Sequence, residues 1–254
     1  MIDLRGKGVL VVGVRRQLGA TVARRLAAEG MNVAISYRSS RDEAEEIEAA
    51  ITADGHRACI VQGDVSIEAD VQRMVQEASE RMGGLWAIAN LASDYPSTQV
   101  DHLTEADWDR GLAAAKGTYL LALAGAKEFE RHSGASVNGH LIFIGDWAAG
   151  ETPYKDFLPY LTAKAAIHFM TRAFAVELAP KDIRVNCIAP GPMQKPPDMA
   201  QEEWDHILQE SAPIHMNSSV EDMAEMIVTL LKSETITGEV IRVDSGRHIA
   251  GTRE

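Results

Sequence analysis

Cysteine, positive charge and long apolar runs are all scarce in this chain of 254 residues. Its two cysteines, Cys59 and Cys187, lie far apart without metal-binding spacing, so we expect reduced core residues and a cytoplasmic protein. The 25 basic residues face 37 acidic ones, and the net charge of −12 argues against binding to nucleic acid or to an anionic membrane surface. The longest apolar run, near residues 119–126, is too short to span a bilayer. The histidines lack metal-ligand spacing, and we predict no metal site.

Two kinds of apolar segment alternate along the chain. Short β-branched runs predict strands at residues 7–13, 32–37, 56–61, 85–89, 139–144, 183–188 and 239–243. Longer amphipathic segments predict helices at 18–30, 41–54, 66–82, 104–115, 117–131, 158–180, 202–210 and 220–232. This alternation predicts βαβ units with right-handed crossovers. We therefore predict one doubly wound α/β domain of the Rossmann type over residues 1–254, with a seven-stranded parallel sheet and helices on both faces.

A tyrosine and a lysine lie four residues apart in the predicted helix 158–180. Residues i and i+4 project from the same face of a helix, so the phenol of Tyr160 and the ammonium of Lys164 would share one small volume. A nearby positive charge lowers the pKa of a phenol, which makes the hydroxyl a usable acid near neutral pH. The alternative is that both side chains are exposed on a solvated helix face.

Two glycines bracket the loop after the first predicted strand, whose sequence is Gly13-Val14-Arg15-Arg16-Gln17-Leu18-Gly19. Glycines let the backbone approach a pyrophosphate, and the N-terminus of the following helix offers free N–H groups and a positive dipole. Arg15 and Arg16 add positive charge. We expect this loop to bind a dinucleotide, with an ordinary strand-to-helix turn as the alternative.

The end of the second predicted strand favours NADPH over NADH. An NAD site usually has an acidic residue there, but this chain has Tyr37-Arg38-Ser39-Ser40. A guanidinium with two hydroxyl groups suits a 2′-phosphate, because arginine binds phosphate as a planar fork. Arg38 could instead be an ordinary surface arginine at the start of a loop.

Polar residues also follow the third and fourth predicted strands. They are Asp64-Val65, whose carboxylate could accept from an adenine amino group, and Asn90-Leu91-Ala92-Ser93. Ligands of open α/β sheets bind at the carboxyl ends of strands, where both segments are expected. Either segment could instead supply a helix cap or a turn.

With these motifs in order, the chain resembles the short-chain dehydrogenase/reductase family over nearly its whole length. The matching segments are the loop 13–19, Asp64-Val65, Asn90-Leu91-Ala92-Ser93, Tyr160-x-x-x-Lys164, Arg184-Val185-Asn186, Pro190-Gly191 and Ile236-Thr237-Gly238 with Val243-Asp244-Ser245-Gly246. The resemblance implies that Tyr160 donates a proton in carbonyl or imine reduction and that Lys164 lowers its pKa and holds the nicotinamide ribose. It implies that Asn90 helps to seat the cofactor and that Pro190 and Gly191 lie along the nicotinamide.

The chain departs from the family pattern at three places. Gln17 replaces the middle glycine of the loop. Segment 108–117 offers only alanines where the family has an asparagine that anchors a proton-relay water, and it is one residue short. Asp146 replaces the catalytic serine, 14 residues before Tyr160, about one more than usual. We expect the relay to be rerouted or impaired. Tyr154 is a rival tyrosine, but it lacks a lysine four residues later.

An aspartate in place of the serine changes the expected substrate. A hydroxyl can donate to a substrate carbonyl, whereas an ionised carboxylate can only accept. Asp146 would therefore repel a developing alkoxide and accept from the N–H groups of a nitrogen heterocycle. This pattern is similar to that of pteridine reductases and dihydromonapterin reductases, a likeness that would place Ser93 near cofactor and substrate. Trp147 could stack on a flat ring, and Met193 could line the same pocket.

We predict an NADPH-dependent reductase of a C=N or C=O group, with a pteridine-like heterocycle as the favoured substrate and Tyr160, Lys164 and Asp146 as the catalytic residues. A reductase of 3-oxoacyl thioesters or other ketones, or an alcohol dehydrogenase, stays open. So does a non-catalytic NADP(H)-binding sensor, because the family's asparagine and serine are both lost. Four prolines between residues 190 and 200 predict a substrate lid over about 190–215. The resemblance implies a homotetramer.

Overall fold

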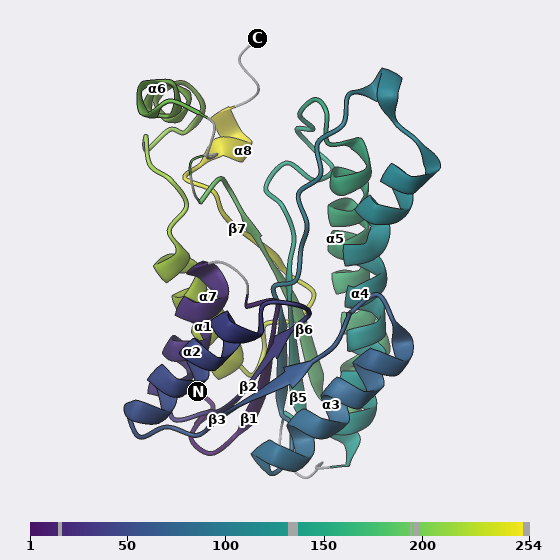
Figure 1. Ribbon diagram of the computed structural model, residues 1–254, viewed down its shortest axis with the longest axis vertical. Helices are drawn as coiled ribbons and strands as arrows, with labels where there is room; N and C mark the ends of the chain where they lie inside the picture. Colours follow the sequence, from purple (N-terminus) through teal and green to yellow (C-terminus); the bar gives the residue numbers. More distant parts are fainter. Residues whose placement is uncertain (15–16, 132–136, 194, 196–198, 251–254) are drawn as a thin grey trace.

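Seven strands lie side by side in one parallel sheet, in the order β3-β2-β1-β4-β5-β6-β7 (Figure 1). The computed structural model describes residues 1–14, 17–131, 137–193, 195 and 199–250. The strands are β1 (Gly8–Val12), β2 (Asn32–Tyr37), β3 (Ala58–Gln62), β4 (Ala87–Asn90), β5 (Gly139–Ile144), β6 (Ile183–Pro190) and β7 (Val240–Val243). Strand β1 pairs in parallel with both β2 and β4. The strands β2 and β3 are therefore added on one side of β1, and β4 to β7 are added on the other. The prediction of a doubly wound α/β fold is confirmed.

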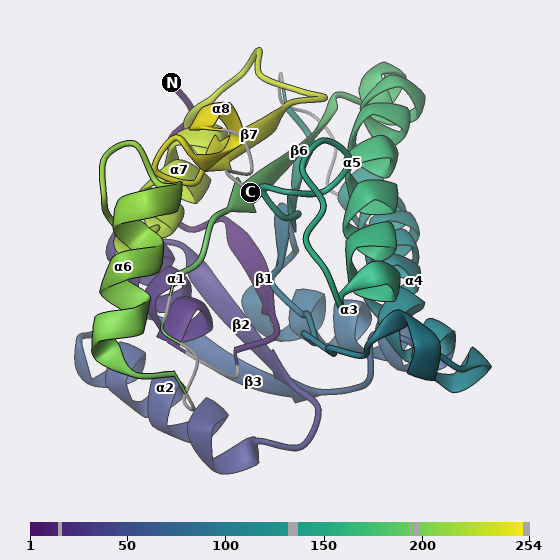
Figure 2. The ribbon, with the colours of Figure 1, turned by 90° about the horizontal axis from the view of Figure 1, so that it is seen from above.

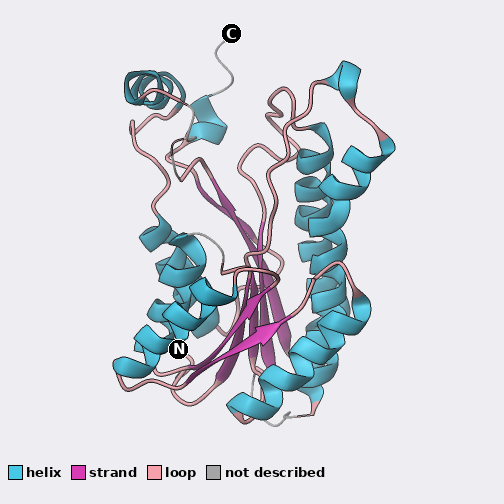
Figure 3. Ribbon diagram, in the orientation of Figure 1, coloured by secondary structure: helices cyan, strands magenta, loops and turns pink. Residues whose placement is uncertain are grey.

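Helices cover both faces of the sheet (Figure 3). They are α1 (Gln17–Ala28), α2 (Arg41–Ala53), α3 (Glu68–Met82), α4 (Glu105–Glu130), α5 (Leu158–Leu178), α6 (Gln201–Ser211), α7 (Val220–Lys232) and α8 (Arg247–Ala250), with short 3-10 helices η1 (Val100–His102) and η2 (Ala179–Lys181). Side chains alternate along β1, so Val9 and Val11 pack with α1, α2 and α7 while Leu10 and Val12 pack with α3, α4 and α5. A strand buried on both faces must be apolar throughout, which explains the continuous valine-rich run in the sequence.

Polar side chains fix where two of the helices begin. Thr104 accepts a hydrogen bond from the backbone N–H of Asp107, whose carboxylate accepts from the backbone N–H of Thr104, so the two form a capping box before α4. Ser219 accepts from two backbone N–H groups at the start of α7. Both caps satisfy donors that the first turn of a helix would otherwise leave unpaired.

The prediction of two helices at 104–115 and 117–131 is wrong, because α4 is continuous over Glu105–Glu130. Gly117, where the second of these helices was predicted to begin, lies in the middle of α4. A Cβ atom at Gly117 would lie 2.7 Å from Cγ2 of Val65, so the glycine serves close packing rather than helix termination. The short helix α8 was also not predicted, since four residues carry no readable period.

Helix α6 lies apart from both helix layers, beyond the carboxyl ends of the strands (Figure 1), and seen from above it lies on the side of α1, α2 and α7 (Figure 2). It follows the irregular segment after Pro190, the last residue of β6. Helix α7 then returns to the sheet and packs against α1. In the described part of the chain, none of the helices is both long and apolar enough to cross a membrane.

Candidate active site

A cavity of about 550 Å³ opens at the carboxyl ends of the strands. Its walls come from the segments after β1 to β6 and from α4, α5 and α6. The predicted site residues that line it are Gly13, Leu18, Gly19, Tyr37, Arg38, Ser39, Asp64, Val65, Ala92, Ser93, Asp146, Trp147, Tyr160, Lys164, Pro190, Gly191 and Met193. Gln17 and Asn90 do not line it. Arg15 and Arg16 lie outside the described residues.

Glycine is required at both described ends of the loop after β1. Gly13 has a φ of +86°, and a Cβ atom there would lie 2.6 Å from the backbone nitrogen of Ala92. A Cβ atom at Gly19 would lie 2.4 Å from Cα of Val14. A side chain at either position would therefore collide with backbone atoms. Because glycine has no side chain, main-chain atoms line the space beside Gly13 and Gly19 and form a cradle there. Such a cradle at a helix N-terminus fits a pyrophosphate.

Asn90 shapes the site by holding neighbouring segments in place, because its side chain does not line the cavity. Its side chain is 3% exposed, donates from Nδ2 to Oγ1 of Thr118 at 3.0 Å, and accepts at Oδ1 from the backbone N–H of Ala92 at 3.2 Å. It thus ties the end of β4 to α4 and fixes the peptide that faces Gly13. Thr118 was not predicted as its partner, because the contact spans 28 residues of sequence.

The segments after β2 and β3 form the far end of the cavity. Arg38 is 70% exposed at its side chain, and its Nη1 lies 3.7 Å from Oδ2 of Asp64. Burial raises the pKa of Asp64, but hydrogen bonds from the backbone and hydroxyl of Ser66 more than compensate and hold it below its usual value. Ser39 and Ser40 line the same end. An exposed guanidinium with adjacent hydroxyls can receive a phosphate group there.

Helix α5 brings Tyr160 and Lys164 to the opposite end of the cavity, on one face as the i, i+4 spacing predicts. The Nζ atom of Lys164 lies 5.6 Å from the centroid of the Tyr160 ring and donates to the backbone oxygen of Ile144 at 2.9 Å. Lys164 is 1% exposed. Burial lowers its pKa from 10.5 to about 8, although the charge of Asp146 acts in the opposite direction.

The carboxylate of Asp146 lies directly against the phenol of Tyr160. Its Oδ2 accepts from the Tyr160 hydroxyl at 2.9 Å and from the Tyr154 hydroxyl at 3.2 Å, while Oδ1 accepts from the backbone N–H of Ala148 at 2.9 Å. Burial raises the pKa of Asp146, and the hydrogen bonds from Ala148 and Tyr160 only partly oppose that rise. An inward-facing carboxylate with three donors is therefore the central polar group at this end of the cavity.

The glycine before Asp146 allows this arrangement. A Cβ atom at Gly145 would lie 2.2 Å from Nε2 of His168, which packs against the end of β5 from α5. The same Nε2 accepts from the backbone N–H of Asp146 at 3.4 Å, and burial lowers the pKa of His168 to about 4. His168 is therefore a neutral packing residue that supports the segment carrying Asp146.

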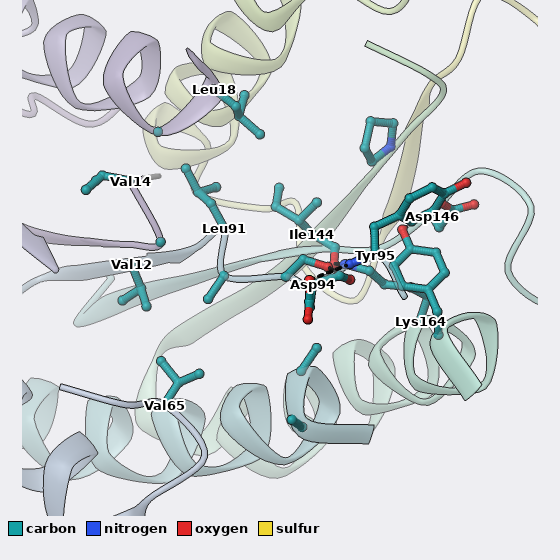
Figure 4. A pocket seen from close by; sticks show the side chains of 18 of the residues that line it. Val12, Val14, Leu18, Val65, Leu91, Asp94, Tyr95, Ile144, Asp146 and Lys164 are labelled. Atoms are coloured by element: carbon teal, nitrogen blue, oxygen red, sulfur yellow. Dashed lines mark hydrogen bonds between the residues drawn. The ribbon is translucent and has the colours of Figure 1, made fainter. Parts of the chain in front are cut away.

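Several aromatic rings lie near the Asp146 carboxylate. Tyr95 stacks on Phe157 with centroids 4.2 Å apart and meets Tyr160 edge-on at 4.8 Å. Trp147 stacks beside Tyr154 at 6.4 Å. Figure 4 shows Tyr95, Asp146 and Lys164 gathered at one end of the pocket, away from Leu18 of α1. A flat ring could enter between these aromatic groups.

A family model described as enoyl-(acyl carrier protein) reductase matches residues 13–248. The chain belongs to the short-chain dehydrogenase/reductase family. It is therefore an oxidoreductase, as the ordered motifs predict.

Relatives of this short-chain dehydrogenase/reductase cover nearly its whole length. It is 31% identical to 3beta-hydroxysteroid dehydrogenase 1 of Eggerthella lenta, over 96% of this chain and 94% of the relative. It is also 31% identical to granaticin polyketide synthase putative ketoacyl reductase 2 of Streptomyces violaceoruber, over 94% and 95%. Among solved structures, FolM alternative dihydrofolate reductase 1 of Brucella suis, in complex with NADP, is 30% identical and superposes with a TM-score of 0.86 over 97% of both chains.

Several cavity residues of this short-chain dehydrogenase/reductase were not predicted as site residues. Tyr95 lies two residues beyond Ser93 and could have been found by extending the segment after β4. Tyr154 was set aside because it lacks a lysine, yet its hydroxyl reaches Asp146. At the cavity mouth, Arg110 of α4 pairs with Asp94 at 2.9 Å, a contact between segments that local sequence patterns do not reveal.

Proposed function

We propose that the protein is an NADPH-dependent reductase of a C=N or C=O group in a flat, amino-bearing heterocycle such as a pteridine. The observation that carries the proposal is the Asp146 carboxylate, which faces the cavity beside the Tyr160 hydroxyl at 2.9 Å. A carboxylate accepts hydrogen bonds and favours N–H donors, and the surrounding rings suit a planar ligand.

The residues at the nucleotide end fit the cofactor. A cradle that a Cβ atom at Gly13 or Gly19 would fill lies at the start of α1, and Arg38 with Ser39 suits a 2′-phosphate more than a free hydroxyl. NADPH, when bound, would supply a hydride to the substrate carbon. Solved relatives from Burkholderia cenocepacia, at 29% identity and a TM-score of 0.87, and from Brucella suis are complexes with NADP, which supports the same cofactor here.

Each catalytic side chain then has one task. Tyr160 donates its hydroxyl proton to the substrate atom that gains negative charge. Lys164 places a positive charge beneath the Tyr160 ring and stabilises charge that develops on the oxygen. Asp146 accepts from the substrate's N–H groups and orients the ring, while Ser93 and Met193 line the space around it.

Reduction of a 3-oxoacyl thioester is the second candidate. It is favoured by the likeness to a putative ketoacyl reductase and by the description of the matching family model. The carboxylate at position 146 argues against it, because the alkoxide that forms from a ketone would develop beside a negative charge. A non-catalytic sensor is disfavoured by the retained pair of Tyr160 and Lys164.

A steady-state assay separates these candidates. NADPH oxidation would be measured with a dihydropterin, dihydrofolate and an acetoacetyl thioester, with NADH in place of NADPH as the cofactor comparison and Tyr160→Phe as the control for chemistry at the site. We expect turnover of a pterin or folate with NADPH and its loss in Tyr160→Phe. Turnover of the thioester alone would overturn the role given to Asp146, and no turnover of any substrate would favour the sensor.

Two further proposals concern the surroundings of the site. Met193 and Trp204 line the cavity from the segment 190–215, which supports a lid over the substrate. Tyr119 and Leu123 of α4 and Phe169 and Val176 of α5 are exposed, which supports a homotetramer built through these helices. The two cysteines are free and buried, which supports a cytoplasmic location. Light scattering on the purified protein would measure the oligomeric state.

A further inference from the structure

Three phenols and one carboxylate form a hydrogen-bonded chain that leads from solvent to the catalytic hydroxyl. The hydroxyl of Tyr95 donates to that of Tyr154 at 3.3 Å, and Tyr154 donates to Oδ2 of Asp146 at 3.2 Å. The same Oδ2 accepts from Tyr160 at 2.9 Å. Tyr95 is 48% exposed, whereas Asp146 and Tyr160 are buried. The chain therefore joins a half-exposed tyrosine to a buried one, and its hydroxyls donate toward Asp146 from both sides.

Neither α4 nor the Lys164 ammonium offers a comparable chain of hydroxyl and carboxyl groups in the part of the site that the structure describes. Along α4, all of which the structure describes, the residues that line the cavity are Arg110, whose guanidinium pairs with Asp94 at 2.9 Å, and Gly111, Ala113 and Ala114, whose side chains carry no polar group. The ammonium of Lys164 is fully buried and donates to the backbone oxygen of Ile144. A reductase that gives a proton from Tyr160 to its substrate must replace that proton before the next turnover.

We propose that Tyr95, Tyr154 and Asp146 form a relay that returns a proton from solvent to Tyr160. The inference rests on the proposed reductase function. It gives Tyr154 and Tyr95 a part in turnover through Asp146, without contact with the reacting atoms.

The proton balance of the relay is simple. The O–H bond of Tyr160 breaks when its proton passes to the substrate. Oδ2 of Asp146 then gives a proton to the Tyr160 oxygen as it takes one from Tyr154. Tyr154 takes the proton of Tyr95, and Tyr95 takes one from bulk water. One proton moves from solvent to product in each cycle, and no group on the path is oxidised or reduced.

The environment of each group suits this order of transfer. Burial raises the pKa of Asp146, so its carboxyl can hold a proton briefly beside Tyr160. Burial and the neighbouring charge of Asp146 also raise the pKa of Tyr154, so Tyr154 remains a hydroxyl and passes its proton only as it receives another. Phe157 packs against the rings of Tyr95, Tyr154 and Tyr160 and keeps the three hydroxyls in line.

Tyr154→Phe tests the relay, because it removes one hydroxyl and keeps the ring that packs on Trp147 and Phe157. Tyr160 carries its proton in the resting enzyme, so we expect the rate of the first turnover to stay within about twofold of the parent. We expect the steady-state kcat to fall by about tenfold or more, with the KM values for substrate and NADPH nearly unchanged. Imidazole, a small diffusible acid, should restore part of kcat in the variant.

Two further variants sharpen the result. Tyr95→Phe should lower kcat in the same way, and adding it to Tyr154→Phe should cost little more, because both act on one path. Thr52→Val is the control for the loss of a hydroxyl, since Thr52 lies in α2 outside the cavity lining, where its hydroxyl donates to the backbone oxygen of Glu48 at 2.8 Å.

Equal slowing of the first turnover and of kcat in Tyr154→Phe would mean that the hydroxyl only positions Asp146, and the relay would be refuted. An unchanged kcat would refute it as well. If the parent enzyme reduces neither the pterins nor the thioester, the proposed function has failed, a result distinguishable from failure of the relay in an active enzyme.

Discussion

Replacing Lys164 by methionine would remove a buried positive charge while keeping an unbranched side chain of similar length. The ammonium is 1% exposed and has the backbone oxygen of Ile144 as its hydrogen-bond acceptor at 2.9 Å. Burial lowers the pKa of Lys164 from 10.5 to about 8, because water solvates the charge better than the protein interior does. The buried charge should therefore lower the free energy of unfolding, and the proposed reaction would require the protein to keep the charge in spite of this cost.

The size of this cost follows from the pKa. A gap of about 2.5 pH units between 10.5 and about 8 corresponds to about 3 kcal/mol at roughly 1.4 kcal/mol per unit. Methionine would remove that cost but leave the oxygen of Ile144 without this donor, a loss of about 1–3 kcal/mol. The two effects oppose each other, so at pH 7 we expect the free energy of unfolding of Lys164→Met to lie within about 2 kcal/mol of the parent's.

The sign of the pH dependence is definite. Above about pH 8 the folded protein releases the proton of Lys164, whereas the unfolded chain keeps it up to about pH 10.5. The unfolded state then binds more protons, so the parent's free energy of unfolding should rise with pH across this window. Relative to Lys164→Met, the rise should reach about 3 kcal/mol at the upper end and should disappear as the pH falls through 8.

Urea unfolding at pH 7 and at pH 9.5 would measure the effect, with NADPH oxidation assayed on the same samples. Lys127→Met, at an exposed position of α4, is the matched control and should show neither the pH-dependent difference nor a loss of activity. We expect Lys164→Met to be folded and to lose at least about a hundredfold in kcat. Parallel stability curves for the parent and Lys164→Met between pH 7 and 9.5 would refute the argument that burial penalises this charge.

Three further substitutions test other parts of the site. Gly19→Ala should lower the free energy of unfolding by about 1–3 kcal/mol and raise the KM for NADPH, because the new Cβ would lie 2.4 Å from Cα of Val14. Thermal unfolding with and without NADPH would measure both effects. Arg38→Ala should weaken NADPH binding by about tenfold and leave NADH binding unchanged, as measured by titration calorimetry; equal losses for both would contradict a 2′-phosphate contact. For Asp146, whose folded-state pKa is raised, the parent should gain stability relative to Asp146→Asn as the pH falls from 7 toward 4, which urea unfolding at both ends would show.

The architecture was predictable because hydrophobic period and strand composition are local properties. The alternation of short β-branched runs with amphipathic segments predicted seven strands and a doubly wound sheet, and both are confirmed. The misplaced break in α4 has a different origin. Glycine lowers helix propensity by about 1 kcal/mol, but at Gly117 that cost is outweighed by close packing on Val65, a contact that sequence period cannot reveal.

The site was predictable only where its geometry follows from a helix or from strand ends. Spacing along one helix was enough to bring Tyr160 and Lys164 together, and the carboxyl ends of strands bring Gly13 near Ala92. The orientation of Asn90 was not predictable in this way, because its partner Thr118 depends on how α4 crosses β4. The contact between Tyr95 and Tyr154 joins two irregular segments 59 residues apart and depends on the full three-dimensional structure.

The aspartate at position 146 and the two tyrosines near it are best understood together. A buried carboxylate destabilises the folded state unless hydrogen-bond donors replace the water that it loses on burial. Tyr160 supplies one donor to Oδ2 and Tyr154 supplies a second, so Tyr154 helps to compensate the Asp146 carboxylate for its burial. Asp146→Ser should therefore deprive the Tyr154 hydroxyl of its carboxylate acceptor. We expect this variant to gain little ketone reductase activity unless Tyr154→Phe accompanies it, because the Tyr154 oxygen can accept the serine O–H in place of the substrate carbonyl.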